Sequence, residues 1–307
     1  MALETDGSPD PSAKRDTSEA PGGAASRRDT IRSFAWFGYT GDEWISDPAE
    51  LSRRAWAEPL AVLAELAEDE DWTGAAPGGA QLPILDRYVR ATYHRLVAED
   101  KIATSDGGAF AALNTGLLTP YAEEIFGLFA RNDHPGAQPW KFVRWATESD
   151  RDILANFPAP PRMAVYIRST ADLVYDVDRP IKLAYEHIIG DNLGRFPREL
   201  AEHPVQARQA LDAAVAFTLK RARRNYKTIV PQWYAHFEEP GFFLPLALTG
   251  RDAADLALVV SAVGDGVYRG NTVFTLDMAY LPARLVARPD SDWLRPQVAP
   301  ADADGEG

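Results

Sequence analysis

The stretch that decides the fold is DLALVVSAVGDGVYRGNTVFTLDMAY, residues 255–280, in which two apolar runs flank Gly264-Asp265-Gly266. Runs rich in β-branched residues on either side of a Gly-Asp-Gly turn predict a β-hairpin, with strands over 255–262 and 267–280. Strand alternation would place one set of side chains of the second run on a common face: Phe274, Leu276, Met278 and Tyr280. The opposite face would carry Val273, Thr275, Asp277 and Ala279.

Outward from this hairpin, apolar residues at helical spacing predict helices over 52–69, 82–99 and 205–225. The turn Ser105-Asp106-Gly107-Gly108 predicts a hairpin of 101–104 with 109–113. Further predicted elements are strands at 124–129, 140–146, 163–167, 242–248 and 284–288 and a short helix near 182–193. Helices and strands do not alternate regularly, and we detect no internal repeat. The sequence therefore predicts a single α+β domain over 31–295, built on a mainly antiparallel sheet.

The 307 residues carry a formal net charge of -13, which is unevenly distributed. Residues 41–72 contribute -8, and the two ends, 1–30 and 296–307, contribute -2 and -3. Both ends are poor in large apolar side chains, so we expect a disordered N-terminal arm over 1–30 and a disordered acidic tail over 296–307. No stretch reaches the roughly 18–20 apolar residues that span a bilayer, and no secretory signal is evident. We expect a cytoplasmic protein without a membrane partner.

Several common chemistries are excluded or weakened by the residues present. There is no cysteine, which excludes disulfides, thiolate-bound metal and a thiol nucleophile. The five histidines are scattered without zinc-ligand spacing, and the phosphate-loop, dinucleotide and nucleophile-elbow motifs are absent. No cofactor is indicated, which leaves arginine, lysine and carboxylate chemistry.

The segment Lys220-Arg221-Ala222-Arg223-Arg224-Asn225-Tyr226-Lys227 holds five cations in eight residues. If the helix continued, Lys220, Arg223, Arg224 and Lys227 would share one face, a row that suits phosphate oxygens, and Tyr226 could stack on a base. Arg269 and Arg284 would extend the positive surface. The alternative is that these cations complement the helix C-terminus and pair with nearby acids.

Two sets of acids are weaker candidates for catalytic or metal-binding roles. Asp277 would be a carboxylate in an apolar strand, which is costly unless it is paired or ligating. Glu148 and Asp150 belong to the acidic run 147–152, whose carboxylates could bind a metal or exchange protons. The alternatives are a structural Asp–Arg pair for Asp277 and a helix N-cap at Ser149 or Asp150.

Four motifs resemble the family called domain of unknown function 3825, over about 31–294. They are Phe34-Ala-Trp36-Phe37-Gly38; Asn114-Thr115-Gly116-Leu117; Arg223-Arg224-Asn225-Tyr226-Lys227 with Val230-Pro231-Gln232; and Tyr268-Arg269-Gly270 leading to Thr275-Leu276-Asp277-Met278-Ala279-Tyr280. The resemblance implies little about activity, because the family has none established. Relatives are sometimes joined to RNA-binding modules, which favours a nucleic-acid role; this chain shows no recognisable extra module.

Three functions are therefore expected, in order of preference. The first is an RNA- or nucleotide-associated domain that binds phosphates through the basic segment 220–227. The second is an enzyme acting on a phosphorylated small molecule or a nucleic-acid end, using Asp277 with Glu148 or Asp150 and nearby cations. The third is a protein-interaction scaffold that uses the acidic segment 41–72.

Overall fold

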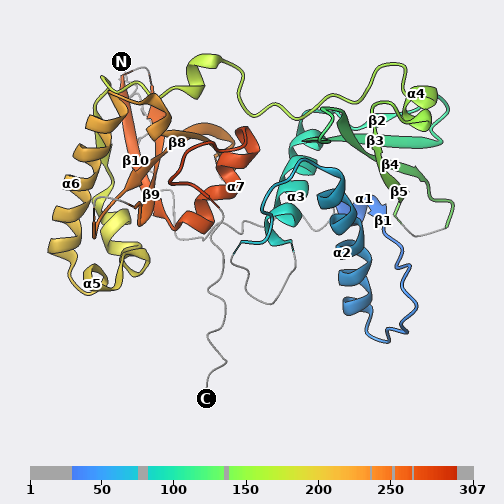
Figure 1. Ribbon diagram of the computed structural model, residues 1–307, viewed down its shortest axis with the longest axis horizontal. Helices are drawn as coiled ribbons and strands as arrows, with labels where there is room; N and C mark the ends of the chain where they lie inside the picture. Colours follow the sequence, from blue (N-terminus) through green and yellow to red (C-terminus); the bar gives the residue numbers. More distant parts are fainter. Residues whose placement is uncertain are drawn as a thin grey trace, which may run out of the picture.

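The computed structural model describes residues 30–74, 82–134, 138–235, 237–250, 253–264 and 266–295. The predicted acidic tail and the predicted N-terminal arm, apart from Thr30, lie outside the described residues. Within them the chain forms helices and two mixed five-stranded sheets (Figure 1), which confirms the α+β class. The strands of the first and second halves pair separately, so the mainly antiparallel pairing predicted from the sequence is divided between two sheets.

The two sheets have the same strand order. The first sheet runs β1 (Ala35–Trp36), β5 (Trp140–Thr147), β4 (Glu124–Arg131), β3 (Phe110–Leu118), β2 (Ala103–Thr104). The second runs β6 (Ile181–Leu183), β10 (Val267–Phe274), β9 (Leu256–Val263), β8 (Glu239–Leu246), β7 (Val230–Tyr234). The strand that comes first in the chain pairs in parallel with the one that comes last: β1 with β5, and β6 with β10. The other pairings in each sheet are antiparallel, and they join the last four strands into a meander. The structure thus contains a repeated topology that leaves no recognisable repeat in the sequence.

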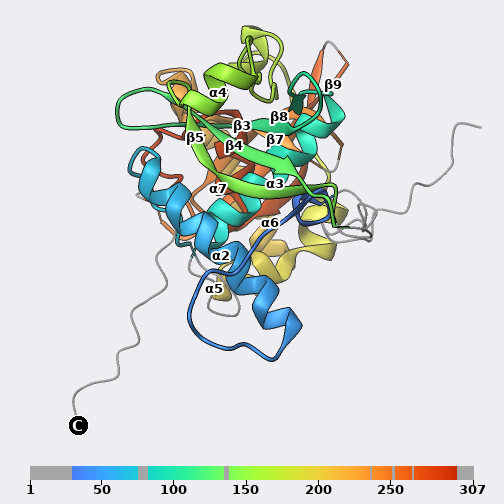
Figure 2. The same ribbon diagram turned by 90° about the vertical axis from the view of Figure 1, so that its right-hand side faces the viewer.

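Helices cover both faces of each sheet. The helices of the first half are α1 (Ile31–Phe34), α2 (Pro48–Leu66), α3 (Pro83–Ala98) and α4 (Arg151–Asn156); those of the second are α5 (Arg198–Ala201), α6 (Pro204–Ala222) and α7 (Leu276–Val286). Short 3-10 or π turns follow at η1 (Thr170–Leu173), η2 (Glu186–Asp191), η3 (Leu193–Arg195) and η4 (Tyr226–Thr228). Helices α3 and α7 contact each other between the sheets, whereas α4 and α6 lie on the outer sides (Figures 1 and 2). None of these helices is long and apolar enough to cross a membrane.

Strand alternation divides the apolar side chains into an inner core and two outer ones. In β9, Ala257 and Val259 join the inner core with α3 and α7, whereas Leu258 and Val260 join the outer core under α6. The first sheet shows the same division, with its outer core under α4. Because both faces are covered, the run Leu256–Val260 is apolar without interruption. We call the face of the second sheet that carries Val259 its inner face.

Most predicted helices are confirmed, and their stripes are buried. Side chains at helical spacing are buried in α3 (Leu85, Val89, Tyr93 and Leu96) and in α6 (Leu211, Val215, Thr218 and Ala222). The hairpin at 101–113 is also confirmed, with Gly107 and Gly108 at positive φ.

Four element predictions were wrong in whole or in part. The strand predicted over 267–280 ends at Phe274, because the Thr275 hydroxyl accepts from the Met278 N–H and starts α7. That helix also takes up most of the predicted strand 284–288. The helix predicted near 182–193 is confirmed only over η2 (Glu186–Asp191), because the residues before it form β6. The segment 163–167 forms no strand, because side chains of the first half hold its backbone.

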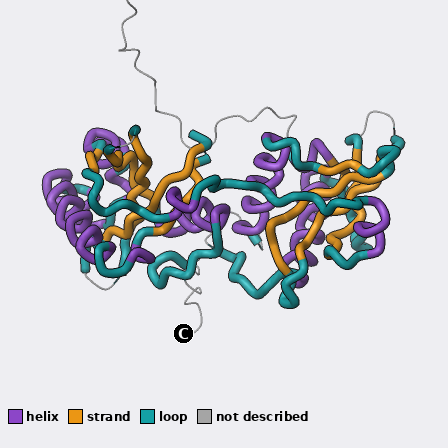
Figure 3. Tube along the Cα trace, turned by 90° about the horizontal axis from the view of Figure 1, so that it is seen from above, coloured by secondary structure: helices purple, strands orange, loops and turns teal. Residues whose placement is uncertain are grey.

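The segment after α4 that links the two halves is hydrogen-bonded to Arg95 of α3 and to Glu99 at its C-terminal end. It runs from one half to the other after α4 (Figure 3). The Val165 carbonyl accepts from Arg95 at 2.9 Å, and the Val165 N–H donates to Glu99 at 3.1 Å. Arg95 also lies 4.6 Å from the ring centroid of Trp233 in β7. One arginine therefore contacts the linking segment and both halves.

A buried ion pair completes the contact between the halves. The Arg284 guanidinium of α7 donates to Glu70 at 2.7 and 2.9 Å, and the side chains are 12% and 4% exposed. The Tyr280 hydroxyl donates to the same carboxylate at 3.0 Å. Arg284 also lies over Trp72 and Tyr88. Burial alone would lower the pKa of Arg284, but the hydrogen bond and charge of Glu70, together with the hydroxyls of Tyr88 and Tyr280, outweigh it and raise that pKa.

We expect Arg284→Met to lower the free energy of unfolding by about 3–5 kcal/mol, because it leaves the Glu70 carboxylate buried and unpaired. Chemical denaturation measures this change. The control is Arg53→Met, whose pair with Glu50 is exposed and should cost less than about 1 kcal/mol. Equal losses in the two variants would contradict a structural role for the buried pair.

Candidate anion site on the second sheet

The site is built on the motif Tyr268-Arg269-Gly270-Asn271-Thr272, which lies in β10. Arg269 pairs with Ser261 of β9 on one side and with Lys182 of β6 on the other. Directly opposed residues of neighbouring strands point to the same face. The adjacent Tyr268 belongs to the outer core. Lys182, Ser261 and Arg269 therefore lie together on the inner face.

Two like charges are neighbours on this face. Lys182 and Arg269 are both exposed, and their Cα atoms are partners in the parallel ladder. Opposed like charges on adjacent strands are destabilising. Within the described ranges, no carboxylate forms an ion pair with either. A bound anion would relieve this repulsion.

A third cation, Arg195, lies further along β10. It comes from η3 and donates to the Val273 carbonyl at 2.7 Å and to the Thr272 hydroxyl at 3.4 Å. Its Cζ atom is 5.9 Å from the ring centroid of Phe274, an inner-core residue. Burial lowers the pKa of Arg195, and Tyr234 acts in the opposite direction. The described part of the chain offers no carboxylate within ion-pair distance of this guanidinium.

A bulge in β10 adds neutral polar groups between these cations. The ladder with β9 shifts register between Gly270 and Thr272. The amide of Asn271 donates to the Ser261 hydroxyl at 2.8 Å. Steric crowding explains the glycine at position 270, because a Cβ there would lie 2.6 Å from a methyl of Leu183. β-Bulges commonly re-aim side chains next to functional sites.

Two acidic groups near this face have perturbed ionisation. Burial raises the pKa of the Glu239 carboxyl, against a hydrogen bond with Ser261. Burial and Glu239 together raise the pKa of Tyr234, against the effect of Arg195. Linked shifts of this kind are frequent at functional sites. On β7, the amide of Gln232 is fully buried and its nitrogen and oxygen lack hydrogen-bond partners.

The basic segment 220–227 does not form the predicted row of cations. Helix α6 ends at Ala222, so Lys220 and Lys227 do not share a helical face. Arg223 pairs with Asp178 at 2.8 Å, and Lys227 pairs with Asp290 at 2.5 Å. Arg224 donates to the Lys220 carbonyl, and Tyr226 is 65% exposed. Because α6 covers the outer face, Arg269 does not extend the surface of this segment.

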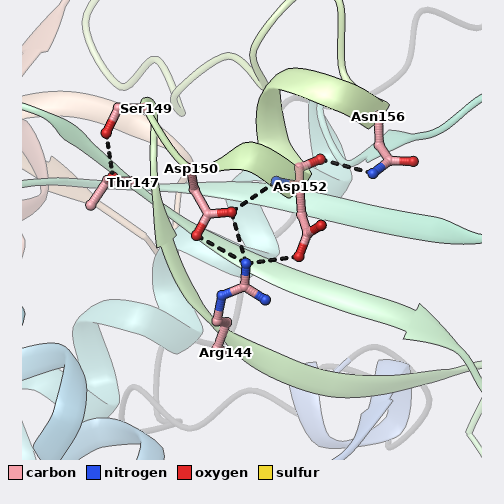
Figure 4. A network of polar contacts seen from close by, with 6 residues as sticks. All are labelled: Arg144, Thr147, Ser149, Asp150, Asp152 and Asn156. Carbon is pink, nitrogen blue, oxygen red and sulfur yellow. Dashed lines mark hydrogen bonds and ion pairs between the residues drawn. The ribbon is translucent and has the colours of Figure 1, made fainter.

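The predicted acids are not brought together. Asp277 lies in the first turn of α7, where an acid favours the helix N-terminus. Asp150 is the N-cap of α4 and accepts from Arg144 at 2.7 and 2.9 Å; Asp152 accepts from the same nitrogen at 2.8 Å (Figure 4). Glu148 is exposed. The N-cap interpretation of this run is confirmed.

Arg284, the remaining candidate from the sequence, and the described histidines do not form a binding site either. Arg284 is the buried partner of Glu70 and is not part of an exposed positive surface. Among the described residues, no group of histidine or carboxylate side chains could hold a metal ion. His236 lies outside them.

The family model for the domain of unknown function (DUF3825) matches residues 63–293. The chain belongs to this family. The match covers most of both halves and includes the Tyr268–Thr272 motif on which the site is built; the motif Phe34–Gly38 precedes it. No curated protein and no solved structure matches the chain.

Sequence reasoning alone did not identify several residues of the candidate anion site in this DUF3825 protein: Lys182, Arg195, Tyr234, Glu239, Ser261 and Asn271. Lys182 and Arg269 are distant in the chain and meet only through strand pairing. A signal was present at Ser261, a hydroxyl that ends an apolar run, but the run alone does not identify its partners.

We expect Glu239→Gln to stabilise the protein near neutral pH. Because burial raises its pKa, the folded state disfavours the ionised carboxylate, and stability is lost as the pH rises above the unfolded value. The denaturation midpoint of the variant should exceed that of wild type at about pH 7 and equal it at about pH 3, where both side chains are neutral.

The matched control is Glu148→Gln, an exposed glutamate on the first half. It should show no such pH-dependent difference. A parallel response of the two variants would contradict a buried carboxyl at Glu239.

Proposed function

We propose that the protein is an RNA- or nucleotide-associated domain that holds phosphate through Lys182, Arg195 and Arg269. The observation that carries this proposal is a set of three cations on one side of the second sheet, for which the described residues supply no carboxylate partner. Arginine forks match phosphate oxygens in a bidentate way, and lysine adds a compact charge. Asn271, Ser261 and Thr272 would supply neutral polar contacts.

This proposal keeps the function expected from the sequence but moves its main site. Arg223 and Lys227 are already neutralised by Asp178 and Asp290. Lys220, Arg221 and Arg224 therefore serve at most as an additional contact from the other face of the sheet. A cytoplasmic location stays a prediction from the sequence.

The two alternatives receive less support. The enzyme that would use Asp277 with Glu148 or Asp150 needs acids that lie on different halves. Asp150 is also occupied by Arg144 and by its own helix. The scaffold function would use the acidic segment 41–72, but Glu70 within it is buried against Arg284.

A pair of charge-matched variants tests the proposal. Lys182→Glu with Arg269→Glu changes the inner face, and Lys220→Glu with Arg224→Glu changes the net charge equally on the α6 side. We expect the first to weaken binding of a labelled single-stranded RNA at least tenfold and the second to change it less than threefold. Filter binding at two salt concentrations measures both effects, and wild-type affinity should fall as salt rises.

Equal losses in the two variants would indicate attraction by net charge alone and would contradict a defined inner-face site. Undiminished binding by the Lys182/Arg269 variant would also contradict it. Thermal unfolding of both proteins checks that the substitutions leave the fold intact.

A further inference from the structure

A cavity of about 590 Å³ lies in the first half, away from the second sheet. It lies between the chain that follows β1 and the first turns of α2 and is open to solvent on one side. Aromatic side chains dominate its lining: Trp36, Phe37, Tyr39, Trp44 and Trp56. This volume is within the range of small-molecule sites.

The aromatic rings form a floor and a rim. Phe37 and Trp56 are buried and meet edge to face, with ring centroids 4.8 Å apart. Trp36 and Trp44 are instead 52% and 89% exposed. Exposed indoles beside a cavity are surfaces on which a planar ring can stack.

Two glycines allow the rings of Trp36 and Tyr39 to lie against the backbone. A Cβ at Gly38 would be 2.8 Å from the Trp36 ring, and a Cβ at Gly41 would be 2.2 Å from the Tyr39 hydroxyl oxygen. Larger residues at either position would displace these rings. The spacing Trp36-Phe37-Gly38-Tyr39-Thr40-Gly41 thus has a steric purpose at the cavity.

Polar contacts fix this loop to α2. Arg54 pairs with Glu43 at 2.5 Å and with Glu50 at 2.9 Å. The Thr40 hydroxyl donates to Glu58. The loop is therefore held in place without a ligand, which lowers the entropy cost of binding.

The cavity also contains a cation that forms no ion pair with a carboxylate of the described residues. Arg32 lines it, and its buried Nε has no hydrogen-bond partner. The Asp86 carboxylate attracts Arg32, but it already accepts from Arg90 at 2.7 Å and from the Trp56 indole. Arg32 and Arg90 lie 5.8 and 5.7 Å from the Trp56 ring centroid. Of the acids in the lining, Glu43 is paired with Arg54, and Asp42 is exposed to solvent.

We propose that this cavity binds a nucleotide unit, with its planar base on the tryptophan rim and its phosphate on Arg32. Stacking surfaces beside a guanidinium that has no ion-pair partner among the described residues select a ligand that is both planar and anionic. The inference rests on the proposed function for the class of ligand. Its residues lie on the other half of the protein, so the two sites can fail independently.

The test measures binding by the full-length protein of AMP, adenosine and a single-stranded hexaribonucleotide, using calorimetry. Wild type should bind AMP at least fivefold more tightly than adenosine. Trp44→Ala should weaken AMP binding about tenfold, because it removes a ring on which the base stacks, and Trp44→Phe should weaken it less. Arg32→Gln should bind AMP and adenosine equally. Tyr121→Ala removes a distant aromatic that is 91% exposed and should change nothing.

The hexanucleotide identifies the source of the nucleotide unit. Trp44-dependent binding of the hexamer without AMP binding assigns the cavity to RNA, and binding of both admits free nucleotides. No binding of either ligand would overturn the inference, as would affinities unaffected by Trp44→Ala and Arg32→Gln. If only the Lys182/Arg269 variant loses RNA, the inner-face site stands and the cavity site is rejected.

Discussion

The buried pair of Glu70 and Arg284 is the interaction on which the arrangement of the two halves depends. It joins the chain before α3 to α7 at a place where both charges are removed from water. Such a pair is tolerated only when further contacts compensate the lost hydration. The Tyr280 hydroxyl and the rings of Trp72 and Tyr88 supply them. With α7 fixed in this way, the inner faces of both sheets share one apolar core.

Each half repeats the same strand order, but the halves meet through unlike helices. In the first half the helix before the meander, α3, faces the shared core; in the second half it is the helix after the meander, α7. The two halves therefore meet through helices at opposite ends of the repeated topology. Their contact buries the inner face near α7 and leaves exposed cations at the β6 edge, where Lys182 and Arg269 lie. The candidate anion site is a consequence of this packing.

Local patterns in the sequence predict the helices well because a buried stripe repeats within one element. They fail at 275–280, where Leu276, Met278 and Tyr280 alternate as in a strand although Thr275 caps a helix. There the N-cap and the inner core outweigh the alternating pattern. The candidate site was predicted only at Arg269. The other residues of the site could not be predicted, because they meet only through strand pairing between distant segments. The burial of Arg284 could not be predicted either, because its partner, Glu70, is 214 residues away in the chain. The cations of 220–227 were conspicuous, but their acids, Asp178 and Asp290, are also remote in sequence.

In the proposed function, the inner-face arginines contact the phosphates, rather than those at the end of α6. Side-chain NMR of the arginine Nε–Hε groups during titration with the single-stranded RNA tests this most directly. We predict that the signals of Arg195 and Arg269 shift with ligand concentration while those of Arg221 and Arg224 stay in place. Shifts confined to Arg221 and Arg224 would contradict the account.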